Sequence, residues 1–114
     1  MLPRSARLTS PNDFARTTKS GLRSTSPSLV TYLYLTGENT PARAGLIISK
    51  SVGGSVVRHS VARKLRAGLS APLGHLPNGA LLVVRALSSK SNINLQAELS
   101  EAISLLISRT KVAQ

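Results

Sequence analysis

The sequence predicts a single-domain two-layer α/β sandwich of the α+β class, with helices packed against one twisted sheet. Two observations predict it. Along the 114 residues, apolar positions repeat with helix or strand spacing in the order α-β-β-α-β-α. Hydrophobic residues make up 41% of the chain, enough for one core in a chain with the length of one domain. We therefore expect one domain over residues 1–114, with flexible ends at about 1–6 and 109–114.

The first helix and the first strand have clear boundaries. Ser10 can cap a helix and Pro11 suits its first position, so we expect a short helix that ends before Gly21. Residues 29–36 (LVTYLYLT) then alternate between two faces, which is typical of a strand. One face carries Val30, Tyr32 and Tyr34, and the other carries Leu29, Leu33 and Leu35.

A second strand and a second helix follow a turn-rich segment. Residues 44–50 (AGLIISK) resume a β-branched run, which we interpret as the second arm of a hairpin with residues 29–36. Gly53 and Gly54 break this run. Residues 55–69 then have helical spacing. Their apolar stripe contains Val57, Val61 and Leu65.

The last strand and the last helix complete the predicted order. Residues 80–86 (ALLVVRA) form a nearly continuous apolar run, typical of a strand covered on both faces. Asn92 or Asn94 would cap the final helix, with Glu98 and Glu101 on its solvent face. The core stripe of that helix contains Leu95, Leu99, Ala102, Ile103 and Leu106.

The charge of the chain indicates a polyanionic partner. Lys and Arg number 15 against 4 Asp and Glu, a formal net charge of +11. Residues 50–66 contain five of these cations and no acid, although surface helices normally carry both signs. Because like charges on one helix repel, an anionic partner such as RNA explains this pattern better than solvation.

Other chemistry has little support in the sequence. Cysteine is absent, and the few acids and histidines form no catalytic or metal-binding pattern. We expect no secretory signal and no membrane span. The segment Gly53–Ser55 is either a phosphate cradle or a plain turn before a helix. The aromatic residues Phe14, Tyr32 and Tyr34 either stack on bases or pack in the core.

The central motif resembles a known family. Residues 45–53 (GLIISKSVG) and 56–66 (VVRHSVARKLR) are similar to the strand, turn and Arg-rich helix of the bacterial ribonuclease P protein subunit. The family signature runs roughly G-x-S-V-S-K-K-V-G-x-A-V-x-R-N-R-V-K-R-x-L-R, and its spacing is kept. The segments 7–8, 12–14 and 78–86 also resemble the family, so the resemblance covers roughly residues 7–107.

The resemblance implies a left-handed β-α-β crossover and a function. The family's protein binds a large catalytic RNA, and together they remove the 5′ leader of precursor tRNA in the cytoplasm. The RNA and its magnesium ions carry out the hydrolysis, so the resemblance implies no catalytic residue, no metal ligand and no cofactor held by the protein alone. The implied partners are ribonuclease P RNA and precursor tRNA, with no membrane and no obligate protein partner.

Two sets of site residues follow from the same resemblance. The first set is expected to bind the catalytic RNA and contains Arg58, His59, Arg63, Lys64 and Arg66. The second set is expected to line a cleft for the single-stranded leader and contains Phe14, Val30, Tyr32, Ser49 and Lys50.

The chain departs from the family signature at several positions. His59 stands in place of the usual Asn, and a second aromatic residue in the first helix is replaced by Thr18. Ser51, Ser60 and Ala62 each replace a cation. The RNA affinity is therefore expected to be weaker, unless other cations compensate; the candidates are Arg16, Lys19, Arg23 and Arg43.

Two alternative functions stay open at this point. Charge and size fit a structural RNA-binding protein, such as a ribosomal protein, equally well. An autonomous endonuclease is disfavoured because acids and histidines are scarce.

Overall fold

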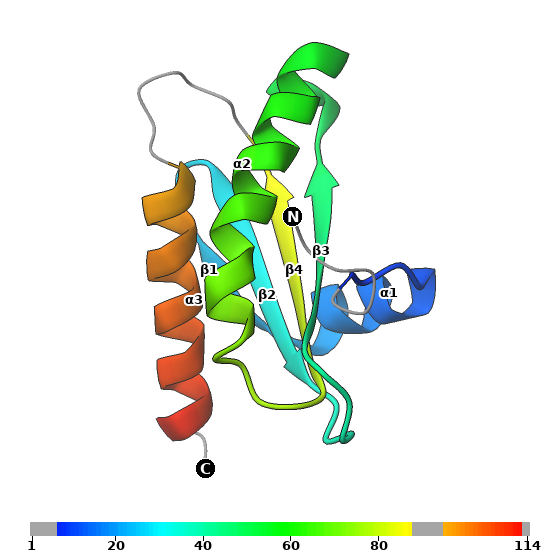
Figure 1. Cartoon of the computed structure of the whole chain (residues 1–114), viewed down its shortest axis with the longest axis vertical. Coiled ribbons are helices and arrows are strands. Elements are labelled where there is room, and N and C mark those ends of the chain that lie inside the picture. The colour runs from blue at the N-terminus through cyan, green and yellow to red at the C-terminus, as the bar shows by residue number, and fades with distance from the viewer. Residues whose placement is uncertain (1–6, 88–94, 113–114) are drawn as a thin grey trace.

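The computed structural model describes residues 7–87 and 95–112 (Figure 1). In this part of the chain the elements follow the order α-β-β-β-α-β-α, which confirms the predicted class and adds one strand. They are α1 (Pro11–Ser20), β1 (Leu22–Thr25), β2 (Leu29–Leu35), β3 (Arg43–Ile48), the 3-10 turn η2 (Lys50–Val52), α2 (Ser55–Leu73), β4 (Ala80–Ala86) and α3 (Leu95–Val112).

Strand β4 lies inside the sheet, whose order is β1-β2-β4-β3. It pairs antiparallel with β2 and parallel with β3. The predicted hairpin between residues 29–36 and 44–50 is therefore wrong, because β4 separates the two strands. The physical reason is the apolar character of β4, which is buried along nearly its whole length and so favours a central place.

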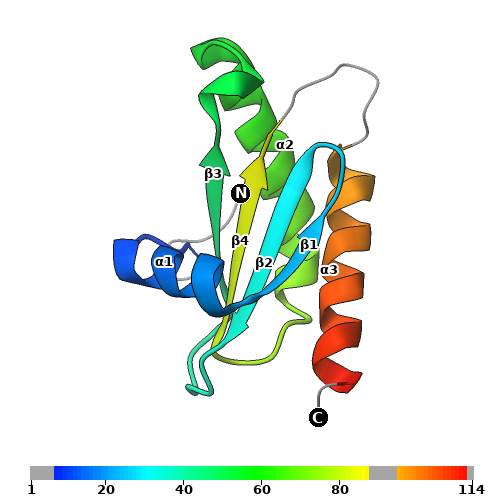
Figure 2. The same ribbon diagram turned by 180° about the vertical axis from the view of Figure 1, so that it is seen from behind.

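The connection from β3 through α2 to β4 is left-handed. In Figure 1 both strands point upward, α2 lies in front of the sheet, and the chain moves from β3 on the right to β4 on the left. Figure 2 shows the same arrangement from behind. The crossover implied by the family resemblance is thus confirmed, although parallel crossovers are right-handed in about 98% of cases.

The strand that the sequence did not predict is β1. It contains only four residues, Leu22–Thr25, and pairs antiparallel with β2 at one edge of the sheet. Three of its four residues are exposed, so no apolar alternation marks it in the sequence.

The sheet has helices on both faces (Figure 1, Figure 2). On one face α2 and α3 cover Leu29, Leu33, Leu82 and Val84, which belong to the main core. The other face, called the α1 face below, carries α1 and a second, smaller cluster. This cluster contains Leu8, Val30, Tyr32, Leu81 and Val83, with Phe14, Tyr34, Ile47 and Leu87 packed against it. The predicted separation of the two faces of β2 is therefore confirmed.

The helices agree with their predicted apolar stripes, with local differences. In α2 the residues Val61 and Leu65 are buried, whereas Val57 is 40% exposed and the helix continues to Leu73. All five predicted core residues of α3 are buried. Ser10 precedes α1 but makes no side-chain cap hydrogen bond. The predicted caps Asn92 and Asn94 lie outside the described residues.

Candidate RNA-binding surfaces

The five residues predicted to bind catalytic RNA lie on one helix and form what we call the α2 surface: Arg58, His59, Arg63, Lys64 and Arg66. All are exposed except Arg58, which is half-buried. Within the described residues, none of the four Lys and Arg side chains forms an ion pair, and α2 contains no acid. The buried stripe of Val61, Leu65 and Leu69 fixes the helix on the sheet, so these charges face solvent.

Two of the departures from the family signature also fall on α2. Ser60 is half-buried, whereas Ala62 is buried with 7% of its surface exposed. A longer cationic side chain at position 62 would therefore need to extend out of a packed environment. At position 60 the environment is more open. A restored cation is therefore expected to lower the stability of the fold more at position 62 than at position 60.

The loop after β3 is attached to the end of β4. The Ser49 N–H donates to the Ala86 carbonyl (3.2 Å), and the Ser51 hydroxyl donates to the Leu87 carbonyl (3.2 Å). Lys50 lies between them and is exposed. Gly53 ends this loop at φ 148°, a conformation that favours glycine. The Gly53 N–H donates to the Lys50 carbonyl, so part of the possible phosphate cradle is occupied by a turn.

Phe14 attaches α1 to the sheet. Its ring lies against Gly45 of β3, where a side chain would collide with the ring carbons. The ring is half-buried and belongs to the cluster on the α1 face. Thr18, one turn later, donates a hydrogen bond to the Phe14 carbonyl (3.0 Å). A small residue in β3 therefore determines how closely α1 approaches the sheet.

Tyr32 and Val30, also predicted for the leader cleft, have too little exposed surface for a base to stack on them. Tyr32 is 8% exposed and Val30 is 9% exposed, so both serve mainly as packing residues of the α1 face. Tyr34 is half-buried, and the Arg16 guanidinium lies 5.5 Å from the centre of its ring. Arg16 also forms an ion pair with Asp13 at 2.9 Å. Of the three predicted aromatic residues, Phe14 and Tyr34 thus keep exposed area.

The two predicted sets of site residues approach each other at one cavity of about 230 Å³. The cavity lies along β3, where Arg7 forms an isolated parallel β-bridge with Ala44. Phe14 from the leader set and Arg66 from the α2 surface both line it. The remaining lining residues are Arg7, Leu8, Thr9, Ala44, Gly45 and Leu46.

One basic residue that the sequence reasoning did not select lies on the α1 face. Arg85 is exposed, although every other residue of β4 is buried. It is paired in register with Val30 of β2 and Ile47 of β3. The signal was present in the sequence as a single cation inside the apolar run ALLVVRA.

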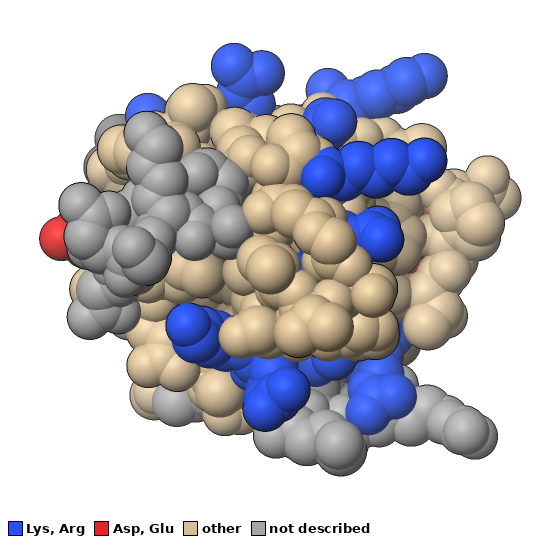
Figure 3. Space-filling view, turned by 90° about the horizontal axis from the view of Figure 1, so that it is seen from above, with Lys and Arg blue, Asp and Glu red and all other residues tan. Residues whose placement is uncertain are grey.

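One end of the molecule carries many basic residues. Figure 3 views this end and shows Lys and Arg in groups on two sides of a largely uncharged area, with Asp and Glu nearly absent from view. A surface of this kind attracts phosphate from more than one direction.

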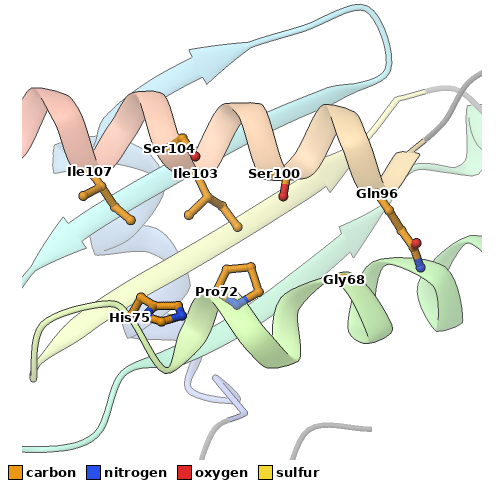
Figure 4. A pocket seen from close by; sticks show the side chains of 8 residues that line it. All are labelled: Gly68, Pro72, His75, Gln96, Ser100, Ile103, Ser104 and Ile107. Atoms are coloured by element: carbon orange, nitrogen blue, oxygen red, sulfur yellow. The ribbon is translucent and has the colours of Figure 1, made fainter.

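A larger cavity, of about 510 Å³, lies between α2 and α3 and differs in character. Figure 4 shows His75 and Pro72 on one side, with Ile103 and Ile107 pointing toward them from α3. The other lining residues are Gly68, Gln96, Ser100 and Ser104. None of the eight carries a permanent charge, and the cavity lies on the face opposite α1. It therefore lacks the cations that an RNA site needs.

Glu98 is a residue whose role the sequence did not predict. Its carboxylate accepts hydrogen bonds from the Ser26 hydroxyl (2.5 Å) and the Ser28 N–H (2.9 Å). The carboxylate therefore fixes the turn between β1 and β2 against α3. The expectation that Glu98 is a solvated surface residue is wrong, because it is half-buried, whereas Glu101 is exposed as predicted.

Two further findings concern metals and membranes. Across the described residues, no three His, Cys, Asp or Glu side chains gather closely enough to hold a metal ion. None of the helices in residues 7–87 and 95–112 combines the length and the apolar character that a membrane span requires.

Comparison with known proteins identifies the family. The family model for ribonuclease P matches residues 2–110. The chain belongs to the ribonuclease P protein family. It is 39% identical over 107 residues to the ribonuclease P protein component of Mycobacterium sp. (strain KMS), covering 90% of this chain and 91% of that protein. It is 45% identical over 95 residues to the corresponding protein of Streptomyces griseus, covering 76% and 77%.

Solved structures agree with the fold of the ribonuclease P protein. The protein from Staphylococcus aureus has a TM-score of 0.73 at 21% identity, covering 96% of this chain and 98% of that chain. The protein from Thermotoga maritima has a TM-score of 0.68 at 21% identity, covering 88% and 94%. These structures show that the chain shares their fold, and the family itself follows from the family model and the sequence relatives. The alternative of a ribosomal protein finds no support among these relatives.

Proposed function

We propose that this chain binds ribonuclease P RNA through the α2 surface and the 5′ leader of precursor tRNA on the α1 face. The observation that carries the proposal is the α2 surface, where exposed cations follow one another along a helix without any acid. Arg63 and Arg66 present planar guanidinium groups, which suit the paired oxygens of phosphate. The sequence-independent attraction to phosphate gives affinity for a structured RNA.

In this proposal the leader lies on the opposite side of the sheet from the catalytic RNA. Phe14 and Tyr34 keep exposed ring area there, and Ser49 and Lys50 lie at the end of β3. An unpaired strand can place a base on a partly exposed ring and a phosphate near Lys50. Tyr32 and Val30 support this surface from below, since they are buried.

The protein's contribution is binding and orientation. When bound to the RNA, magnesium ions supply the activated water and stabilise the charge that develops on the phosphate. The residues of this chain hold the two RNA molecules in a fixed relative position. On the basis of the family resemblance, we assign catalysis to the RNA. On the same basis, we assign the place of action to the cytoplasm. Binding of this kind lowers the barrier by positioning the reactants.

The experiment that tests the proposal is cleavage of a 5′-labelled precursor tRNA at low magnesium. A bacterial ribonuclease P RNA is assayed with and without this protein, and the protein is assayed alone. We expect cleavage at the mature 5′ end only when RNA and protein are combined. Cleavage that is unchanged by the protein, despite RNA binding, would indicate a structural module, and cleavage by the protein alone would indicate an autonomous endonuclease.

A further inference from the structure

Arg85 is a cation of the α1 face that comes from an inner strand of the sheet. It is exposed on a strand whose other six residues are buried. Within the described residues it forms no hydrogen bond, ion pair or ring contact. By contrast, Arg16 on the same side is engaged with Asp13 and Tyr34. The Arg85 guanidinium is therefore available to a ligand.

The neighbours of Arg85 form a continuous row across the sheet. Ile47, Arg85, Val30 and Thr25 are directly opposite one another on β3, β4, β2 and β1. With strands about 4.8 Å apart, this row is about 14 Å long. Its residues next to Arg85 are apolar, and Leu87 belongs to the same cluster. The exposed guanidinium can donate paired hydrogen bonds to phosphate oxygens, while its apolar neighbours in this row offer no competing side-chain acceptor.

Other parts of the α1 face border this row on two sides. Phe14 covers Gly45, two residues before Ile47 on β3, so α1 crosses the neighbouring part of the sheet. Beyond the row, the Ser51 hydroxyl is bonded to the Leu87 carbonyl, which places Lys50 close to the end of β4. The row therefore lies between two elements that already belong to the predicted leader cleft.

From this geometry we infer that Arg85 binds a phosphate of the single-stranded leader and fixes where the leader crosses the sheet. The inference rests on the proposed function. The leader is favoured over the catalytic RNA because Arg85 and the α2 surface lie on opposite faces of the sheet (Figure 1, Figure 2). A role in solubility alone needs only a polar side chain, so Arg85→Gln separates the two explanations.

The test uses the complete holoenzyme and a series of precursor tRNAs that differ only in leader length, from a single nucleotide upward, with mature tRNA as reference. Dissociation constants are measured for the wild-type protein and for Arg85→Gln, Arg85→Ala and Arg85→Lys. We expect Arg85→Gln and Arg85→Ala to match the wild type for the shortest leaders and to bind longer leaders about tenfold more weakly. Arg85→Lys should restore part of this loss. For a long leader, the slope of log Kd against log salt should fall by about 0.7, the value for one phosphate contact on a single strand.

Controls separate this inference from the proposed function. If the wild-type protein does not stimulate cleavage, the proposed function fails, whatever Arg85 does. If it does, unchanged binding of Arg85→Gln at every leader length overturns the inference. An equal loss at every length, mature tRNA included, also overturns it, because Arg85 would then act through the catalytic RNA. Arg63→Ala, on the α2 surface and away from the cavity that Phe14 lines, provides the comparison for a loss independent of leader length. Thermal unfolding of each variant shows whether it is folded.

Discussion

The α2 surface takes its five basic side chains from nine consecutive residues of one helix, whereas the α1 face combines side chains from α1 and from several strands. On α2 the spacing of a single segment determines which residues are exposed. On the α1 face, the neighbours of a residue are set by strand order and register, which connect positions far apart in the sequence. The residues of a helical binding surface can thus be predicted from the local sequence. The residues of a sheet surface can be predicted only when the strand order and register are known.

The largest effect is expected where α1 joins the sheet. A Cβ atom at Gly21 would lie 2.5 Å from the Thr17 carbonyl oxygen and 2.8 Å from the Leu33 carbonyl oxygen, both on the backbone. We expect Gly21→Ala to lower the free energy of unfolding by about 2–3 kcal/mol. Urea denaturation measures this change. Gly54→Ala is the matched control, since nothing lies within 4 Å of its Cβ position; equal losses in the two variants would contradict the packing argument.

Loss of the Glu98 carboxylate should lower the stability of the protein at the edge of the sheet. Glu98→Ala removes the acceptor of the Ser26 hydroxyl and the Ser28 N–H, both near buried positions. Hydrogen bonds to a charged acceptor contribute about 1.5–3 kcal/mol, so we expect a loss near the lower end, about 1.5 kcal/mol. Thermal unfolding provides the measurement. Glu101→Ala, on the same helix but exposed, should change stability by less than about 0.5 kcal/mol, and similar losses for both would reject the assigned role of Glu98.

On the α2 surface, mutations should affect binding rather than folding. We expect Arg63→Ala to weaken binding of ribonuclease P RNA about fivefold and to reduce the salt dependence, because one phosphate contact is lost. The unfolding midpoint should not change, since Arg63 is exposed. Filter binding at two salt concentrations measures the effect. Arg63→Lys keeps the charge and should retain most of the affinity; an unchanged dissociation constant for Arg63→Ala would place the RNA elsewhere.

The smallest effect is expected from restoring a cation to α2. Ser60 is half-buried at a position where the family signature has Arg, so Ser60→Arg should raise RNA affinity about twofold to threefold at little cost in stability. Ala62→Lys is the comparison, because Ala62 is buried and the new side chain must leave a packed site. We expect Ala62→Lys to lower the unfolding midpoint, as measured by circular dichroism. A stable Ala62→Lys variant would show that the helix surface is looser than the packing indicates.

The elements with local signals could be predicted from the sequence. The alternation of residues 29–35 and the apolar run of residues 80–86 gave both strands, and the apolar stripe of α3 gave its core residues. Strand pairing could not be predicted, because the contact between β2 and β4 spans about fifty residues and leaves no periodic mark. For the same reason Leu22–Thr25 was missed: its pairing with β2, rather than its composition, makes it a strand.

For the candidate site, many of the residues could be predicted from the sequence, but their burial and their neighbours could not. The basic residues of α2 follow from the helical spacing together with the family resemblance, and in the structure they lie on one helix. The burial of Tyr32 and the exposure of Arg85 depend on neighbours from other strands and on α1. A cation inside an apolar strand was visible in the sequence, but which face it occupies only becomes clear from the register.

The central position of β4 has a consequence for synthesis of the protein. Ribosomes synthesise the chain from its N-terminus, so α1, β1, β2, β3 and α2 emerge before residues 80–86. Until then β3 has no neighbouring strand, and β2 pairs only with the short β1. The basic helix is thus synthesised before the sheet that supports it is complete. Both surfaces of the protein are completed together, when β4 inserts between strands already made.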